Sequence, residues 1–322
     1  MSDYRDGPRL LADVGGTNAR FALEIAPFRF EAVAVLACAD HPSLGAAMQA
    51  YLAGAAAQYP GPIRHAAVAI ANPVDGDKVR MTNHHWSFST AAMRAQLGLD
   101  TLVVVNDFTA LAMALPHLDP AQRVQVGGGE AQPGRTIGLV GPGTGLGVSG
   151  LVPAAGRWVA LASEGGHASF ASGDGFEDAI VRQLRARFGH VSAERLLSGP
   201  GIELIHECIS GKALGAAEIT RRAQDGSCAD CVRSIDVFCG ALGSVAGNVA
   251  LTLGATGGVY IGGGIVPRLA ALIERSRFRA RFEAKGRLSA YVAGIPTYLI
   301  TEQYPAFLGA SAILSEHLAG QH

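Results

Sequence analysis

The sequence predicts an α/β protein with two similar lobes, and three observations carry that prediction. The chain has 322 residues, 49% hydrophobic and 16% charged, so it can form two hydrophobic cores and is too apolar for a disordered chain. Strand-like and helix-like segments alternate along it. Residues 10–23 and 135–150 each show a strand, a glycine-rich turn and a returning strand, which indicates an internal duplication. A ligand-binding cleft is expected between two such lobes.

The first glycine turn follows an apolar strand that ends at Asp13. Gly15 and Gly16 lack a Cβ, so backbone N–H groups there can approach an anion closely. Thr17 and Asn18 add side-chain donors at the same place. A carboxylate beside a phosphate is repulsive unless a cation lies between them, so the stretch predicts a magnesium–nucleotide site. The alternative is a glycine hairpin with no ligand.

The rest of the first half alternates between strands and helices. Ser89 is expected to cap a short helix that Gly98 ends, and Pro116 is expected to stop the next helix. Residues 79–88 are predicted as strand or loop. Further strands are expected at residues 30–38, 63–71 and 101–105, and helices at residues 42–59, 90–98 and 108–115.

The second half follows the same plan. An uncharged stretch, residues 237–267, resembles a membrane span in composition, but nine glycines interrupt it. It is better divided into the end of a helix and a buried strand. Strands are expected at residues 158–162, 258–261 and 297–300, and helices at residues 175–188, 231–253, 267–276 and 305–318.

The second glycine turn, residues 143–147, reads Gly-Thr-Gly-Leu-Gly. The chain contains no G-x-x-x-x-G-K-[ST] motif, which excludes a P-loop enzyme. No acidic residue follows on the next strand as a dinucleotide site requires, so the turn is interpreted as a second phosphate loop. A flexible hairpin is the alternative.

Asn106 and Asp107 follow a fully apolar strand, and such strand ends project side chains into the ligand crevice of an α/β sheet. An aspartate there can accept a hydroxyl proton as a phosphoryl group arrives. The alternative, which is compatible with the first, is that Asp107 caps the helix starting at Phe108.

Glu164 and His167 are separated by two glycines, and this polar pair on a bendable loop suits two adjacent hydroxyls of a sugar. A solvated turn or half a metal site are the alternatives. No second pair with zinc spacing accompanies it, which disfavours a metal.

Composition excludes several classes of partner. The net charge of −1 gives no reason to expect nucleic acid or an anionic membrane. Five irregularly spaced cysteines fit a reducing cytoplasm, and the polar N-terminus does not read as a signal peptide. Cys228 and Cys231 are too few for zinc, and they and the pair His84-His85 are interpreted as packing or surface residues. Residues 275–281, rich in arginine, are interpreted as a solvated helix end.

Taken together, the motifs resemble bacterial ATP-dependent glucokinases over nearly the whole chain and in family order. They are DVGGTNAR at 13–20, MTNHHW at 81–86, NDFTA at 106–110, PGTGLG at 142–147, SEGGH at 163–167, SAERLLSGPG at 192–201 and YIGGGIVPR at 260–268. The resemblance implies an actin/hexokinase fold of two ribonuclease-H-like lobes with the active site in the cleft between them. The last helix would return to the first lobe, which gives a small lobe of residues 1–117 with 304–322 and a large lobe of residues 118–303.

The resemblance also implies the reaction and its residues. The γ-phosphoryl group of ATP would pass to the 6-hydroxyl of glucose, with Asp107 as the catalytic base and lobe closure excluding water. The implied glucose ligands are Asn106, Asp107, Glu164, His167 and Glu194, the last on the resemblance alone. Asp13 would lie near Mg²⁺, directly or through water. The implied ATP site comprises Ala12, Asp13, Val14, Gly15, Gly16, Thr17, Asn18, Gly143, Thr144, Gly145, Gly262, Gly263 and Gly264. The family is commonly a cytoplasmic homodimer.

Two rival functions are less consistent with these residues. A non-catalytic sugar sensor on the same fold would not need Asp107 or the phosphate turns. A polymerising or chaperone-type ATPase would not explain Glu164 and His167. Related sugar-responsive repressors carry a cysteine-rich zinc motif and an N-terminal helix-turn-helix, whereas residues 170–189 contain no cysteine and little chain precedes the first strand.

Overall fold

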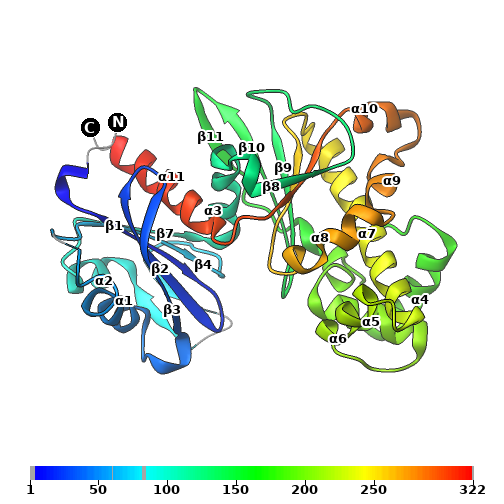
Figure 1. The fold of residues 1–322 in the computed structure, drawn as a ribbon, viewed down its shortest axis with the longest axis horizontal. Coiled ribbons are helices and arrows are strands. Elements are labelled where there is room, and N and C mark those ends of the chain that lie inside the picture. The colour runs from blue at the N-terminus through cyan, green and yellow to red at the C-terminus, as the bar shows by residue number, and fades with distance from the viewer. Residues whose placement is uncertain (1–3, 60, 82–84, 321–322) are drawn as a thin grey trace. The chain divides into compact units, whose positions relative to one another are not determined.

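The computed structural model describes residues 4–59, 61–81 and 85–320. Thr82, Asn83 and His84 of the predicted MTNHHW motif lie outside these residues. The chain forms two units, one comprising Met1–Leu118 with Gln303–His322 and the other Asp119–Glu302. Figure 1 labels their elements, which run in colour from the N-terminus to the C-terminus.

The first unit is built on a five-stranded sheet in the order β3-β2-β1-β4-β7 (Figure 1). Strand β2 runs antiparallel to both β1 and β3, whereas β1, β4 and β7 are parallel. The strands are β1 (Arg9–Val14), β2 (Asn18–Ala26), β3 (Arg29–Ala37), β4 (His65–Ile70) and β7 (Thr101–Asn106). A small hairpin, β5 (Lys78–Arg80) with β6 (Ser87–Ser89), lies where strand or loop is predicted.

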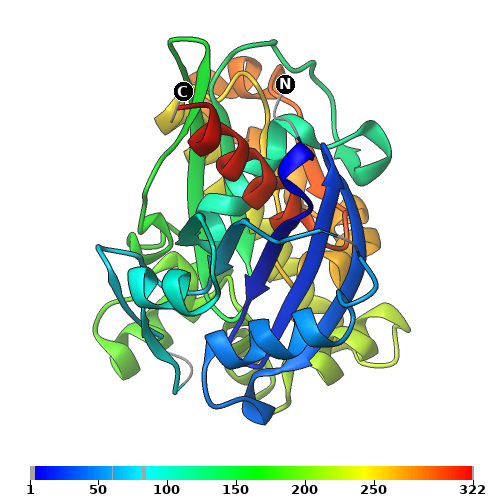
Figure 2. The same cartoon turned by 90° about the vertical axis from the view of Figure 1, so that its left-hand side faces the viewer.

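Helices cover both faces of this sheet (Figure 2). They are needed on both faces because its strands carry apolar side chains on both sides. Leu10 of β1 joins the core formed with α1 (Leu44–Ala53) and α2 (Thr90–Gln96). Leu11 faces the other way, toward Phe307 of α11 (Pro305–Ala319). Helix α11 crosses α3 (Asp107–Ala114) so closely that a Cβ at Gly309 would lie 1.7 Å from the Ala110 carbonyl oxygen. The last helix therefore packs on the first unit.

The second unit repeats the sheet of the first. Its order is β11-β10-β9-β12-β13-β8, with β10 antiparallel to β9 and β11, and with β9, β12 and β13 parallel. The predicted internal duplication and the α/β fold class are confirmed. The added edge strand β8 was not predicted. The strands are β8 (Arg123–Val126), β9 (Ile137–Pro142), β10 (Leu146–Ala154), β11 (Arg157–Ala160), β12 (Val259–Ile261) and β13 (Thr297–Ile300).

Helix α7 is the centre of the helical part of the second unit, and α5, α6 and α9 pack against it (Figure 1). Among the described residues it is the one helix long and apolar enough to cross a membrane, but 67% of its apolar window is buried within the protein. The uncharged stretch thus divides into α7 and buried β12, as predicted. The helices of this unit are α4 (Gly175–Phe188), α5 (Gly199–Ser210), α6 (Ala216–Gln224), α7 (Ala229–Leu253), α8 (Val266–Arg275), α9 (Phe278–Glu283) and α10 (Ser289–Ala293).

The interpretation of residues 275–281 as a solvated helix end holds for exposed Arg275, the last residue of α8, and is wrong for Arg281. They span the end of α8 and the start of α9, and the Arg281 side chain is only 13% exposed. Its guanidinium donates to both carboxylate oxygens of buried Glu177 on α4, at 2.7 and 2.8 Å. A run of basic residues is interpreted as solvated when no acidic partner lies nearby in the sequence. Here the partner, Glu177, lies 104 positions away, so the local pattern could not reveal it.

Candidate active site

The carboxyl ends of three parallel strands meet at one edge of the first sheet. The registers pair Val14 of β1 with Ile70 of β4, and Ile70 with Asn106 of β7. The residues that follow these strands therefore emerge side by side, at the position where open α/β sheets bind ligands. This places the first glycine turn and Asn106-Asp107 at the same edge.

The first glycine turn joins β1 to β2 in a tight hairpin, in which the Gly15 N–H donates to the Asn18 carbonyl at 3.0 Å. The hairpin pairs Asp13 with Arg20, whose guanidinium donates to the carboxylate at 2.9 Å. Burial raises the pKa of Asp13 above its ordinary value, and Arg20 opposes that shift. Arg20 thus favours the ionised form of a carboxylate that burial would otherwise tend to neutralise.

Asn106, and not Asp107, caps helix α3. Its side-chain oxygen accepts the N–H groups of Phe108 and Thr109, at 2.9 and 3.1 Å, and the helix begins at Asp107. The alternative in which Asp107 caps a helix starting at Phe108 is therefore wrong. The Asn106 amide donates to Asp107 Oδ1 at 3.2 Å and to the Asn72 carbonyl at 3.3 Å. Asn106 therefore holds the Asp107 carboxyl in place.

The Asp107 carboxyl has the electrostatic properties of a proton acceptor. Burial first, and then repulsion from the Asp13 carboxyl, raises the pKa of Asp107 to about 6. A carboxyl with that pKa is ionised at neutral pH yet more basic than an ordinary aspartate. General bases work best when their pKa lies near the working pH.

The other residues predicted at the first glycine turn differ in how far their side chains are exposed. The side chains of Ala12 and Val14 are fully buried in the core, so only their backbone can face a ligand. Thr17 is exposed, and Gly16 and Asn18 are half-buried. Contact with a nucleotide would thus rest on the backbone of the turn and on Thr17 and Asn18.

The second glycine turn is closed by a hydrogen bond within the turn and held by another to a neighbouring segment of the second unit. The Gly143 N–H donates to the Gly145 carbonyl at 2.8 Å, and the Gly143 carbonyl accepts the Gly199 N–H at 2.9 Å. Exposed Thr144 lies at the tip. This fixes the turn against the first residue of α5.

Gly262, Gly263 and Gly264 follow β12 and lie beside the end of β9. The Gly262 N–H donates to the Val140 carbonyl at 3.0 Å. Gly263 has φ of 92°, and a Cβ there would lie 2.5 Å from the Pro142 carbonyl oxygen. Glycine is therefore required at Gly263 by both backbone conformation and space. The structure thus brings this segment to the strand that leads into the second turn.

Glu164, His167 and Glu194 converge in the second unit. His167 Nε2 lies 4.0 Å from Glu164 Oε2, and its Nδ1 lies 4.0 Å from Glu194 Oε1. The side chains of Glu164 and His167 are 81% and 61% exposed, whereas that of Glu194 is 32% exposed. Glu194 Oε2 accepts the Leu146 N–H at 2.9 Å, which ties this carboxylate to the second glycine turn.

Two glycines make this convergence possible. A Cβ at Gly166 would lie 2.0 Å from the Leu146 carbonyl oxygen, so the short helical turn Gly165–His167 can pack against β10 only with glycine there. A Cβ at Gly145 would lie 2.4 Å from Glu194 Oε2. The absence of a Cβ at Gly166 and Gly145 thus lets the Leu146 carbonyl and the Glu194 carboxylate approach the backbone closely.

The donor groups fit a magnesium ion held jointly with a phosphate. Among residues 4–59, 61–81 and 85–320, no group of three or more histidine, cysteine or acidic side chains could hold a metal. Mg²⁺ does not need such a cage, because it is usually bound by one or two carboxylates together with substrate phosphates and water. Asp13, whose carboxyl lies close enough to Asp107 to raise its pKa, supplies a carboxylate of that kind.

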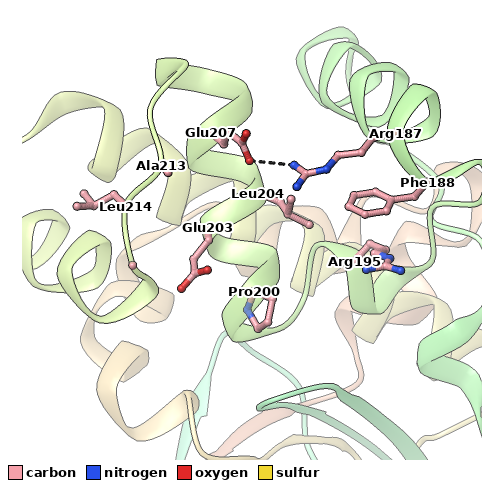
Figure 3. A pocket seen from close by; sticks show the side chains of 10 residues that line it. Arg187, Phe188, Arg195, Pro200, Glu203, Leu204, Glu207, Ala213 and Leu214 are labelled. Atoms are coloured by element: carbon pink, nitrogen blue, oxygen red, sulfur yellow. Dashed lines mark hydrogen bonds and ion pairs between the residues drawn. The ribbon is translucent and has the colours of Figure 1, made fainter.

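A separate surface pocket of about 510 Å³ opens between the end of α4 and α5 (Figure 3). The ring of Phe188 lies between two arginines, with Arg187 and Arg195 at 5.0 and 4.2 Å from its centroid. Arg187 is paired with Glu207 at 3.0 Å. None of the predicted site residues lines this pocket, although Arg195 directly follows Glu194.

Sequence reasoning from the residues alone missed two members of the site. Glu194 lies 48 positions from the backbone N–H that it accepts, and no local pattern reveals such a contact. Arg20 could have been found, because a hairpin centred on the glycine turn pairs residues at equal distances from it.

A family model, known proteins and solved structures are similar to this chain over most of its length. The family model described as Glucokinase matches residues 10–317. The glucokinase of Chromobacterium violaceum is 56% identical over 318 residues, which cover 97% of this chain and 90% of that relative. The bifunctional protein glk of Paraburkholderia xenovorans is 57% identical over 325 residues, 99% of this chain and 50% of the relative. The chain thus spans about half the length of that bifunctional relative.

Among solved structures, the crystal structure of a glucokinase from an Antarctic psychrotroph is similar over most of both chains. It has a TM-score of 0.88 and 38% sequence identity, and it covers 96% of this chain and 99% of that one.

Proposed function

Because the chain belongs to the glucokinase family, we propose that it transfers the γ-phosphoryl group of ATP to the 6-hydroxyl group of D-glucose. The observation that carries the proposal is the Asp107 carboxyl, held by Asn106 at the carboxyl edge of the sheet with a pKa raised to about 6. Glucose 6-phosphate and ADP would be the products, as in the first step of glycolysis.

Asp107 acts as the proton acceptor in this proposal. The phosphoryl group arrives at the sugar oxygen as the hydroxyl proton leaves, and the ionised carboxyl takes that proton. Asn106 keeps the carboxyl oriented through its amide, since its own oxygen is engaged in capping α3. This arrangement supports the assignment of Asp107 as base and of Asn106 as a residue that positions it, whereas contact of Asn106 with the sugar rests on the family resemblance.

Glu164, His167 and Glu194 would bind the remaining sugar hydroxyls. Carboxylates accept hydrogen bonds from hydroxyl groups, and an imidazole can donate or accept. His167 lies 4.0 Å from each glutamate, a separation at which one hydroxyl group can hydrogen-bond both partners of a pair from the side. Asp107 lies in the first unit, and these three residues lie in the second.

The two glycine turns would bind the phosphates of ATP through backbone N–H groups, with Thr17 and Thr144 as side-chain donors. Gly262, Gly263 and Gly264 would lie near the adenosine. Asp13 would hold Mg²⁺, directly or through water. The ion supplies positive charge that offsets the charge developing on the phosphates.

We further propose that the protein acts in the cytoplasm and as a homodimer. Five cysteines without a disulfide among the described residues are consistent with a reducing compartment. The homodimer rests on the family resemblance, and light scattering coupled to size-exclusion chromatography tests it. A monomer at micromolar concentration would contradict it.

The test of the reaction is ADP release from Mg²⁺–ATP with and without D-glucose, and with mannose, fructose and N-acetylglucosamine in parallel. Glucose-selective release supports the proposal. Release selective for another sugar would keep the reaction class but change the roles of Glu164, His167 and Glu194. Glucose binding without sugar-dependent ADP release would favour a non-catalytic sugar sensor.

A further inference from the structure

The proposed reaction does not use Cys228 and Cys231, which lie at the start of α7. Cys228 is the N-cap residue, in an extended conformation with φ of −142° and ψ of 111°. Its sulfur accepts the N–H of Cys231 at 3.4 Å. Cys231 lies in the first turn and is fully buried, whereas Cys228 is half-buried and both are free thiols.

The Cys228 sulfur lies against the backbone of the residue that carries the second thiol, since it accepts the Cys231 N–H. A disulfide can form only where the backbone already brings both side chains together, because its geometry is narrow. Here the extended N-cap conformation directs the Cys228 side chain over the first turn of α7, toward Cys231. The Cys228 sulfur therefore already lies over the helical turn that carries Cys231.

The environment gives the two thiols different roles. Hydrogen bonds from the Cys231 thiol and backbone N–H lower the pKa of Cys228, whereas burial raises the pKa of Cys231 to about 11. The Asp230 carboxylate opposes the thiolate at both positions, but the Asp230 backbone N–H favours it at Cys228. Arg222 at the end of α6 favours the thiolate at Cys231. The accessible Cys228 is thus the nucleophile, and the buried Cys231 stays protonated until it is needed.

We propose that Cys228 and Cys231 form a reversible intramolecular disulfide by exchange with a low-molecular-weight disulfide of the glutathione type. The Cys228 thiolate attacks one sulfur of oxidised glutathione, the S–S bond breaks, and one glutathione leaves as a thiolate that takes a proton from solvent. Cys231 then loses its proton and attacks the Cys228 sulfur, which releases the second glutathione. The protein dithiol is oxidised by two electrons, and one glutathione disulfide is reduced to two thiols.

The sequence makes this reaction easy to follow. Trypsin cleaves after Arg222 and Arg233, so a single peptide, residues 223–233, contains both cysteines. The full-length protein is incubated with oxidised glutathione, quenched in acid, alkylated and digested. We expect the peptide to lose two hydrogen atoms in mass, to resist alkylation and to recover both properties after treatment with dithiothreitol.

Two single variants separate the steps. In Cys231→Ser no second thiol can resolve the intermediate, so we expect a stable mixed disulfide with glutathione at Cys228. In Cys228→Ser the serine hydroxyl keeps the N-cap hydrogen bond, and buried Cys231 should stay unmodified in the folded protein. Cys208→Ser, at a half-buried cysteine whose pKa burial raises, is the matched control and should behave like the wild type.

The proposal is overturned if the wild-type peptide stays a dithiol while free glutathione disulfide is in large excess. It is also overturned if the wild type carries glutathione as stably as Cys231→Ser, because Cys231 then does not resolve the intermediate. Equal thermal unfolding temperatures of the variants and the wild type exclude misfolding as the cause of either result.

Discussion

Replacing Asp107 by asparagine separates catalysis from stability, because the same buried carboxyl should favour the first and oppose the second. Asparagine keeps the shape and an oxygen that can accept the Asn106 amide hydrogen bond, but it cannot take a proton. We expect turnover to fall by about 10²–10⁴-fold, the usual contribution of a positioned general base. The KM for glucose should change much less.

The stability effect follows from the sign of the pKa shift. The pKa of Asp107 rises from 3.8 to about 6 on folding, so ionising this carboxyl costs about 3 kcal/mol of folding free energy at neutral pH. The penalty is nearly absent at pH 3, below the unfolded-state pKa, reaches about half its value near pH 5, and is almost complete by pH 7, above the folded-state pKa. Asp107→Asn removes it, so the ligand-free variant should melt at a higher temperature than the wild type at pH 7.5. At about 2–4 °C for each kcal/mol, the rise should be about 6–12 °C.

The measurement is a set of thermal unfolding curves of both proteins at pH 5 and pH 7.5, without nucleotide or sugar, beside steady-state kinetics. Asp77→Asn is the matched control, because hydrogen bonds from Ser89 and from the Ala91 backbone lower the pKa of Asp77, and removing its charge should not raise the unfolding temperature. Full activity of Asp107→Asn would remove this residue from the mechanism. An unfolding temperature below that of the wild type at pH 7.5 would refute the electrostatic argument.

Three further substitutions test other contacts. Glu194→Gln removes the charge that would strengthen the proposed hydrogen bond from a sugar hydroxyl, a bond worth about 1.5–3 kcal/mol when the acceptor is charged, so the KM for glucose should rise by up to about tenfold to a hundredfold, and an unchanged KM would remove Glu194 from the sugar site. Gly166→Ala places a Cβ 2.0 Å from the Leu146 carbonyl oxygen and should cost about 1–3 kcal/mol in urea unfolding, whereas Gly175→Ala, where a Cβ meets nothing within 4 Å, should not be destabilising. Arg281→Met leaves a buried glutamate on α4 unpaired and should cost about 3–5 kcal/mol in the same assay, a loss that a solvated arginine would not produce.

The sequence predicts those parts of the fold whose signals are local. Ser89 and Gly98 bound α2 as expected, since a cap and a helix end are set by the residues at those positions. The helix predicted at residues 175–188 matches α4 to the residue. The two glycine turns could be found for the same reason, because a tight turn between apolar strands leaves its mark within a few residues.

The parts that the sequence did not predict depend on distant partners. Strand β8 pairs with β13, more than 170 positions later, and its four residues carry no distinct pattern. Helix α5 begins with a Ser198 N-cap and has Pro200 in its first turn. This local start signal could have predicted the helix. Whether Asn106 or Asp107 caps α3 could not be decided from two adjacent residues that both cap helices well.

The duplicated sheet shows how one topology can supply two kinds of chemistry. In the first unit the parallel strands lead to acidic groups, Asp13 and Asp107, which burial makes more basic than usual. In the second unit, the ends of β9 and β12, which correspond to β1 and β4, are followed by Gly143 and Gly262, which offer backbone N–H groups and space. In the proposed function, proton acceptance requires a carboxylate with a raised pKa, whereas a phosphate requires N–H donors and, where a carboxylate such as that of Asp13 lies beside it, a cation between the two. The proposed base therefore lies on the first copy of the sheet, and a proposed phosphate-binding turn lies on each copy.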